Sequence, residues 1–169
     1  MPVSETVPAG EIGQLIVRGP QVMSGYWNKP SETAQKLRAG WIYTGDLFSR
    51  DEDGFYTFHG RADDMIVSGG ENVYPREVEE ILYRCPGVQE AAVVGLPDVK
   101  WGSVITAFIV RSDPNVSSQH IDAFCKTSED LAPYKRPKRY HFLDELPTNP
   151  SGKVLKRELI ATHAHEEAA

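Results

Sequence analysis

The sequence predicts an α+β protein in which a mainly β segment, ending near Gly60, precedes a small α+β domain. Up to Gly60, aromatic strand-like runs alternate with turn residues. Beyond it, the hydrophobic pattern follows the order strand, helix, strand, strand, helix, strand. The chain has 169 residues, 40% hydrophobic and 25% charged, which suits a buried core and excludes a disordered chain.

The first segment contains three strand-like runs and one short helix. Gly19-Pro20 stops the first run, and Asp51–Gly54 forms a turn between the other two. Ser31 is the expected N-cap of the helix and Gly40 its expected end. The segment carries too little apolar surface to form a core alone. The runs are Glu11–Arg18, Trp41–Tyr43 and Phe55–Phe58, and the helix covers Glu32–Arg38.

The clearest helix of the second segment follows the glycines at Ser68–Gly70. Pro75 suits the first helical position, acidic residues follow it, and Pro86-Gly87 ends the helix. The spacing of four residues predicts a buried stripe: Val78, Ile81, Leu82 and Cys85.

The remaining elements of the second segment are short. A helix capped by Ser117 or Ser118 is expected to bury Ile121, Phe124 and Cys125, and a last helix covers Val154–Ala161. The domain boundary is expected near Arg61–Asp64, giving domains over 1–61 and 62–162 and a flexible tail over 163–169. The expected strands are Met65–Val67, Val88–Gly95, Ser103–Arg111 and Arg139–Leu143.

The net charge of −6 disfavours general nucleic-acid binding. Between Tyr134 and Arg157, however, the chain carries a net charge of +5, and the remainder carries −11. A basic patch of this size suits a small polyphosphate ligand, and a solvated basic face explains it equally well. The cations are Lys135, Arg136, Lys138, Arg139, Lys153, Lys156 and Arg157.

The sequence predicts a cytoplasmic protein without a membrane span. No apolar run approaches the roughly 20 residues that a span requires, and the N-terminus lacks the basic and apolar regions of a signal peptide. Cys85 and Cys125 fit no metal spacing, and we expect both to be reduced thiols packed in helices. The five histidines form no metal site, and no nucleophilic triad or P-loop is recognisable.

Four short motifs carry possible chemistry, and each has a plainer explanation. Asp46 follows a glycine at the expected end of a strand, where it could accept hydrogen bonds from a ribose diol or simply form a turn. Arg61 beside Asp63 and Asp64 could be a surface ion pair. The glycines of Ser68–Asn72 allow close approach of another molecule, or only a turn. Lys153 on a flexible loop could neutralise a phosphoryl group, or be one more surface lysine.

Together, the order and spacing of these motifs are specific. The chain resembles the C-terminal part of the adenylate-forming superfamily of acyl-CoA synthetases, adenylation domains and firefly luciferase. Within it, the likeness is to acyl- and aryl-CoA ligases, 4-chlorobenzoate-CoA ligase in particular. The motifs that carry the resemblance are Gly25–Pro30, Trp41–Asp46, Gly60–Ile66, Gly69–Pro75, Glu77–Glu79, Asp98–Gly102, Tyr134–Tyr140 and Ser151–Lys153.

The resemblance implies a small mixed sheet with flanking helices, the C-terminal lid, preceded by a mainly β remnant of a large AMP-binding domain. In such ligases a carboxylic acid attacks ATP to give an acyl-adenylate and pyrophosphate, and coenzyme A then displaces AMP. By resemblance, Asp46 and Arg61 hold ATP or AMP, Asp63 is the hinge about which the lid rotates, and Lys153 is the catalytic residue of the first step.

For the second step, the resemblance implies a coenzyme A site. Gly69 and Gly70 flank the pantetheine channel, Trp101 and Tyr134 pack against coenzyme A, and Arg136 meets its phosphates. Mg²⁺ is expected with ATP, but no metal ligand is assigned in this chain.

The family's phosphate loop and acyl pocket have no counterpart in the sequence. We therefore expect a fragment that is inactive alone, lacks its N-terminal domain and leaves the carboxylic acid substrate unidentified; a homodimer is possible. Three alternatives stay open. They are the adenylation domain of a peptide synthetase, a luciferase-like oxygenase, and a stand-alone binding module without catalysis.

Overall fold

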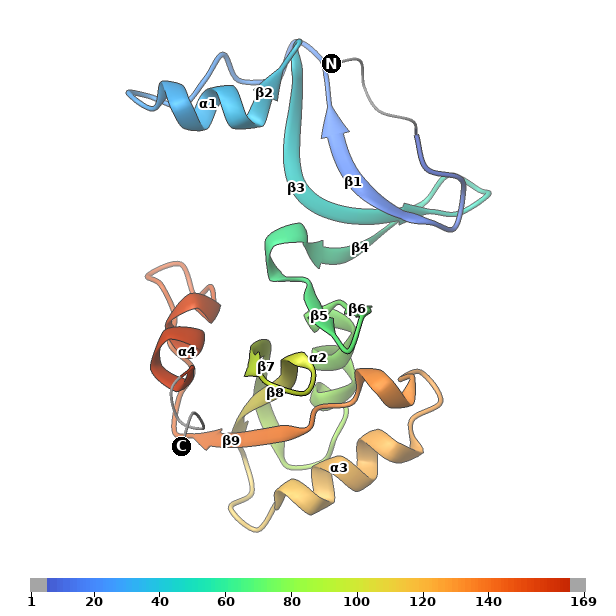
Figure 1. Cartoon of the computed structure of the whole chain (residues 1–169), viewed down its shortest axis with the longest axis vertical. Coiled ribbons are helices and arrows are strands. Elements are labelled where there is room, and N and C mark those ends of the chain that lie inside the picture. Colours follow the sequence, from blue (N-terminus) through green and yellow to red (C-terminus); the bar gives the residue numbers. More distant parts are fainter. Residues whose placement is uncertain (1–5, 165–169) are drawn as a thin grey trace. The chain divides into compact units, whose positions relative to one another are not determined.

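The computed structural model describes residues 6–164 and divides the chain into two compact units, one ending at Asp63 and the other beginning at Asp64. This division lies within Arg61–Asp64, where the sequence analysis expected the boundary. Figure 1 shows both units, and each is described by itself.

The first unit is an antiparallel sheet built around one long strand, β3 (Trp41–Arg50), which is coloured cyan in Figure 1. Strand β3 pairs with β1 (Ile12–Val17), β2 (Leu37–Arg38) and β4 (Tyr56–Arg61). Gly45 is the one fully buried residue among those described in this unit. The unit therefore has little apolar core of its own, in line with its sequence.

The short helix of this unit differs from the prediction at both ends. Helix α1 covers Pro30–Lys36, so Lys29 and not Ser31 occupies the N-cap, because Pro30 suits the first helical position. Leu37 and Arg38, predicted to be helical, form β2 instead. Ala39 and Gly40 both adopt positive φ, at 50° and 79°, and make the two-residue turn into β3.

The second unit contains a mixed three-stranded sheet, which confirms the predicted fold class. Strand β7 (Val88–Asp98) pairs antiparallel with β8 (Gly102–Arg111), and β9 (Arg139–Leu143) runs parallel to β8. A 3₁₀ turn, η1 (Ala62–Asp64), spans the division between the units, and a small hairpin of β5 (Ile66–Ser68) and β6 (Glu71–Val73) precedes the sheet. The helices are α2 (Pro75–Tyr83), α3 (Ser118–Thr127) and α4 (Lys156–His163), and η2 (Pro133–Lys135) is a further 3₁₀ turn.

Each face of this sheet has its own core, because successive side chains of a strand point to opposite faces. Val93 and Ile105 belong to the core beneath the β5–β6 hairpin, α2 and α3. Val94, Val104 and Phe108 belong to the core that α4 covers. The β5–β6 hairpin and α4 therefore lie on opposite faces of one sheet, as Figure 1 shows.

Several predicted boundaries in this unit were wrong by a few residues. Helix α2 ends at Tyr83, so Cys85 is buried just beyond the helix and not within it, whereas Cys125 lies in α3 as expected. Helix α4 runs to His163, which was assigned to the tail. The rest of that tail, residues 165–169, lies outside the described residues.

Candidate functional site

The candidate nucleotide residues Asp46 and Arg61 face each other across β3 and β4. They are paired in register, and Nη1 of Arg61 lies 2.6 Å from Oδ1 of Asp46. The same Nη1 donates to the carbonyl oxygen of Thr44 at 2.9 Å. Asp46 was expected at the end of a strand but lies in the middle of β3, because the strand continues to Arg50. The sequence missed this continuation, since a glycine within a strand resembles a stop.

Gly45 leaves room for the Arg61 guanidinium to lie against strand β3. Gly45 adopts a φ of +81°, and a Cβ there would lie 2.8 Å from Nη2 of Arg61. A side chain at this position would displace the guanidinium from the strand backbone. The side chains of Asp46 and Arg61 are each about one third exposed, so part of the ion pair is accessible from solvent.

Lys36, at the end of α1, is a cation that sequence reasoning missed. Its Nζ lies 3.2 Å from the same Cβ position on Gly45. Two cations therefore converge on one strand residue beside the Asp46 carboxylate. Only the pairing of β2 with β3 brings Lys36 here, and no local sequence pattern indicates it.

Asp63, the expected hinge residue, lies in the 3₁₀ turn at the end of the first unit. Its carboxylate is 65% exposed, and its Oδ2 lies 3.9 Å from Nη2 of Arg61. An exposed pair at this distance contributes little stability, so the turn is held only weakly by this contact.

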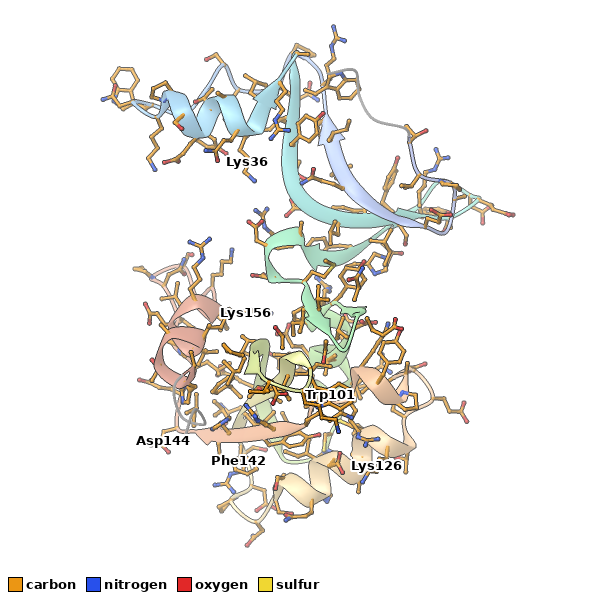
Figure 2. All side chains as sticks on the ribbon, viewed as in Figure 1. Lys36, Trp101, Lys126, Phe142, Asp144 and Lys156 are labelled. Carbon is orange, nitrogen blue, oxygen red and sulfur yellow. The ribbon has the colours of Figure 1, made fainter. Side chains whose placement is uncertain are left out.

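The structure brings together two of the predicted coenzyme A residues, Gly69 and Trp101. Gly69 lies in the turn of the β5–β6 hairpin, and its N–H donates to the carbonyl oxygen of Trp101 at 2.9 Å. A Cβ on Gly69 would lie 2.9 Å from Cε3 of the Trp101 ring, whereas one on Gly70 would meet nothing within 4 Å. Figure 2 labels Trp101 in the loop between β7 and β8. The indole thus covers one glycine and leaves the other open.

Tyr134 lies within η2 and Arg136 directly follows it, but the two side chains differ in exposure. Tyr134 is 47% exposed, and Nζ of Lys135 lies 5.7 Å from its ring centre. The Arg136 side chain is only 22% exposed, and its Nε lies 2.9 Å from Oδ1 of Asp122 on α3. Burial raises the pKa of Asp122, but the side chains of Lys126 and Arg136 outweigh it, and the net shift of this pKa is downward. A phosphate at Arg136 would have to compete with this carboxylate.

The basic stretch presents less positive charge than its count of +5 suggests, because acids from elsewhere in the chain pair with most of its cations. Four of its seven cations form ion pairs, each with a nitrogen–oxygen distance of 2.7 to 2.9 Å. These acids are distant in sequence, and the fold alone brings them to the cations. The pairs are Lys135–Glu77, Arg136–Asp122, Arg139–Asp98 and Lys156–Glu79.

Lys153 is exposed, and among the described residues its ammonium has no ion-pair partner. The loop that carries it is ordered by Asn149, whose Oδ1 accepts the N–H groups of Ser151 and Lys153 at 3.0 and 2.9 Å. Thr148 and Val154 form a bridge that closes the loop. The backbone of the expected flexible loop is therefore held, while the Lys153 side chain is exposed.

Lys153 and the glycine hairpin lie on opposite faces of the sheet. Val154 packs on the core beneath α4, whereas Ile66 and Val73 of the hairpin belong to the other core. A group that needs Lys153 and a group that needs Gly69 must therefore approach different faces of this unit.

The described residues lack two further features. No helix among residues 6–164 is both long and apolar enough to cross a membrane. The same residues contain no cluster of three or more His, Cys, Asp or Glu placed to hold a metal ion.

Comparison with known proteins supports the resemblance. Residues 77–153 match the family described as AMP-binding enzyme C-terminal domain. The chain is 49% identical, over 89% of its length, to a long-chain-fatty-acid–CoA ligase of Bacillus subtilis (strain 168). It is 48% identical, over 94% of its length, to a feruloyl-CoA synthase of an Amycolatopsis species. The chain spans 27% and 32% of these relatives, respectively.

A solved structure gives the same result. The chain superimposes with a TM-score of 0.85 and 43% identity on o-succinylbenzoate CoA synthetase from Bacillus subtilis, solved in complex with an acyl-adenylate intermediate. The match covers 90% of this chain and 31% of that one. The particular likeness to 4-chlorobenzoate-CoA ligase stays a prediction. Residues 77–153 are thus identified as an AMP-binding enzyme C-terminal domain, and the homologues of the chain are acyl-CoA and aryl-CoA ligases of the adenylate-forming superfamily.

Proposed function

We propose that this chain is the C-terminal portion of an AMP-forming acyl-CoA ligase, and that it works together with an N-terminal AMP-binding region. The observation that carries the proposal is the separation of two chemistries on one sheet. The loop of Lys153, an exposed lysine without an ion-pair partner among residues 6–164, lies on one face. Gly69, covered by Trp101, and the open Gly70 lie on the other. A two-step enzyme that rotates this unit needs such an arrangement.

In the first step, a carboxylate oxygen of the acid attacks the α-phosphorus of ATP, and the bond to the bridging oxygen breaks to release pyrophosphate. Lys153 lies between the two anions and lowers the barrier to their meeting. Asp46 accepts hydrogen bonds from the ribose hydroxyls, and Arg61 contacts the same nucleotide. The exposed third of the Asp46 and Arg61 side chains supports this role.

In the second step, the sulfur of coenzyme A attacks the acyl carbonyl carbon. The bond to the phosphate oxygen breaks, AMP leaves, and the thiol proton is released. Gly69 and Gly70 flank the pantetheine, Trp101 and Tyr134 pack against it, and Arg136 contacts the phosphates after exchanging its Asp122 partner. Arginine suits phosphate because of its planar donor fork.

Rotation between the two steps is assigned to Asp63, which lies where the two units meet in sequence. Replacing Asp63 by proline would fix φ and remove the backbone N–H. In the complete ligase, Asp63→Pro should therefore slow the second step relative to the first. Equal retention of both partial reactions would exclude Asp63 as the hinge.

The proposal also includes a cytoplasmic location, Mg²⁺ arriving with ATP, a homodimer, and no ligase activity for this chain by itself.

The deciding experiment compares Lys153→Ala with Arg157→Ala in the complete ligase. Arg157 is an exposed cation four residues away and serves as the matched control. Lys153→Ala should slow adenylate formation, followed by acid-dependent pyrophosphate exchange, by about 10²–10³-fold. Thioester formation from a preformed adenylate should change little, and the control should change neither step. Equal slowing of both steps by Lys153→Ala would refute the role given to this residue.

A further inference from the structure

Asp98 closes the β7–β8 hairpin and organises the loop that carries Trp101. Asp98 pairs in register with Gly102, so the loop between them contains only three residues. Its Oδ1 accepts the N–H groups of Lys100 and Trp101 at 2.8 and 2.9 Å. Its Oδ2 lies 2.9 Å from Nη2 of Arg139 on β9. Both carboxylate oxygens are therefore engaged, and the side chain is only 15% exposed.

These contacts hold Asp98 in its ionised form. The hydrogen bond from the Trp101 N–H is the largest cause that lowers the pKa of Asp98, and the Lys100 N–H and the charge of Arg139 add to it, against a smaller opposing effect of burial. A carboxylate that accepts backbone N–H groups is charged throughout the neutral range.

The effect of Asp98 extends to the glycine hairpin through Trp101. Asp98 fixes the N–H of Trp101, while the carbonyl oxygen of Trp101 accepts the N–H of Gly69. The Trp101 ring lies against Gly69, yet 38% of the residue stays exposed. A continuous chain of contacts therefore joins Arg139, Asp98, Trp101 and Gly69, which come from three separate segments.

We propose that Asp98 is a positioning residue for the coenzyme A half-reaction. It holds Trp101 against Gly69, beside which the pantetheine passes. This inference rests on the proposed function. Without the carboxylate, two N–H groups of a three-residue loop lose their acceptor, and the ion pair between Arg139 and Asp98 is lost. The indole then samples several orientations, and coenzyme A must order it on binding.

The test uses Asp98→Ala and Asp98→Asn in the complete ligase, with Asp113→Ala as the matched control. Asp113 also orders a short loop, because its Oδ1 accepts the N–H and Nδ2 of Asn115 at 2.9 Å. Asp98→Ala should raise the KM for coenzyme A roughly 10-fold to 100-fold, the range expected for a misplaced contact. Acid-dependent pyrophosphate exchange should stay within twofold. Asp98→Asn should lie between Asp98→Ala and the native enzyme, because an amide oxygen still accepts both N–H groups.

Each outcome bears on the inference. It is supported if the KM for coenzyme A rises selectively, with Asp113→Ala near the native value. The inference is overturned if Asp98→Ala leaves this KM unchanged. It is also overturned if Asp98→Ala slows both half-reactions equally and lowers the melting temperature of the ligase. A native ligase that forms no thioester with any of a panel of aryl and alkyl acids would instead refute the proposed function.

Discussion

Replacing Gly69 by alanine tests the contact with Trp101 directly, because the neighbouring glycine supplies the control. Gly69 and Gly70 both adopt positive φ, at +60° and +89°. An alanine at either position therefore has the same kind of backbone strain. Only at Gly69 would the new methyl group meet a side chain, 2.9 Å from Cε3 and 3.2 Å from Cζ3 of the Trp101 ring.

The magnitude follows from these two contributions. A non-glycine residue in the left-handed region costs about 1–2 kcal/mol. Overpacking adds about 1–3 kcal/mol, and the lower part of that range applies because the half-exposed indole can move. We expect Gly70→Ala to destabilise the protein by about 1–2 kcal/mol and Gly69→Ala by about 2–4 kcal/mol. In a Trp101→Ala background, Gly69→Ala should cost only the backbone strain, about 1–2 kcal/mol.

The assay is urea denaturation of the whole chain, followed by far-UV circular dichroism, for the native protein and the variants Gly69→Ala, Gly70→Ala, Trp101→Ala and Gly69→Ala/Trp101→Ala. The coupling energy between residues 69 and 101 is the quantity of interest. The reasoning is refuted if the two glycine variants unfold at the same urea concentration. It is equally refuted if removing the indole leaves the cost of Gly69→Ala unchanged.

Three further predictions concern other parts of the second unit. Oε1 of Glu79 accepts the N–H of Val93 at 2.8 Å and lies 2.7 Å from Nζ of Lys156, so Glu79→Gln should lower the free energy of unfolding by about 1.5–3 kcal/mol. A double-mutant cycle with Lys156→Met, measured by urea denaturation, should show coupling between the two residues, and additive effects would contradict this link. Burial raises the pKa of Cys125 to about 11. In a Cys85→Ser variant, Cys125 should therefore react with an aromatic disulfide at pH 8 at least about 10²-fold more slowly in the native protein than in the unfolded protein. Rapid labelling of the native protein would contradict this burial. Because the pKa of Asp122 is lowered in the native protein, the unfolded chain binds more protons near pH 3–4. The stabilisation that the Asp122 carboxylate contributes is therefore present above about pH 4 and disappears as the pH falls through the lower native pKa. Asp122→Asn should flatten this part of a curve of unfolding free energy against pH, and an unchanged slope would contradict the assignment.

The elements that the sequence predicted well are those whose signals are local. The stripe of Val78, Ile81 and Leu82 needs only one helical turn to be recognised, and all three residues are buried. The paired apolar strands that form β7 and β8 are likewise visible as short apolar runs. Errors occurred where pairing decides between alternatives, as at Leu37, where a strand partner overrides a helical pattern.

The basic stretch shows the limit of charge counting. Its cations are adjacent in sequence, but their partners Glu77, Glu79, Asp98 and Asp122 come from α2, β7 and α3. Counting charges along the chain therefore predicted a patch that the fold largely neutralises. Lys153 is different, because it lies in a short closed loop and forms an ion pair with none of these acids.

By itself, the sequence determined the family, the α+β class and the identity of the residues proposed to act, since motif order and hydrophobic period are properties of the chain. Tertiary structure alone decided which of those residues meet: Asp46 with Arg61, Trp101 with Gly69, and Lys153 with no acid among the described residues. The physical reason is that these contacts depend on strand register and on which face of a sheet a side chain occupies. A shift of one residue in pairing reverses the face, and nothing local in the chain records that choice.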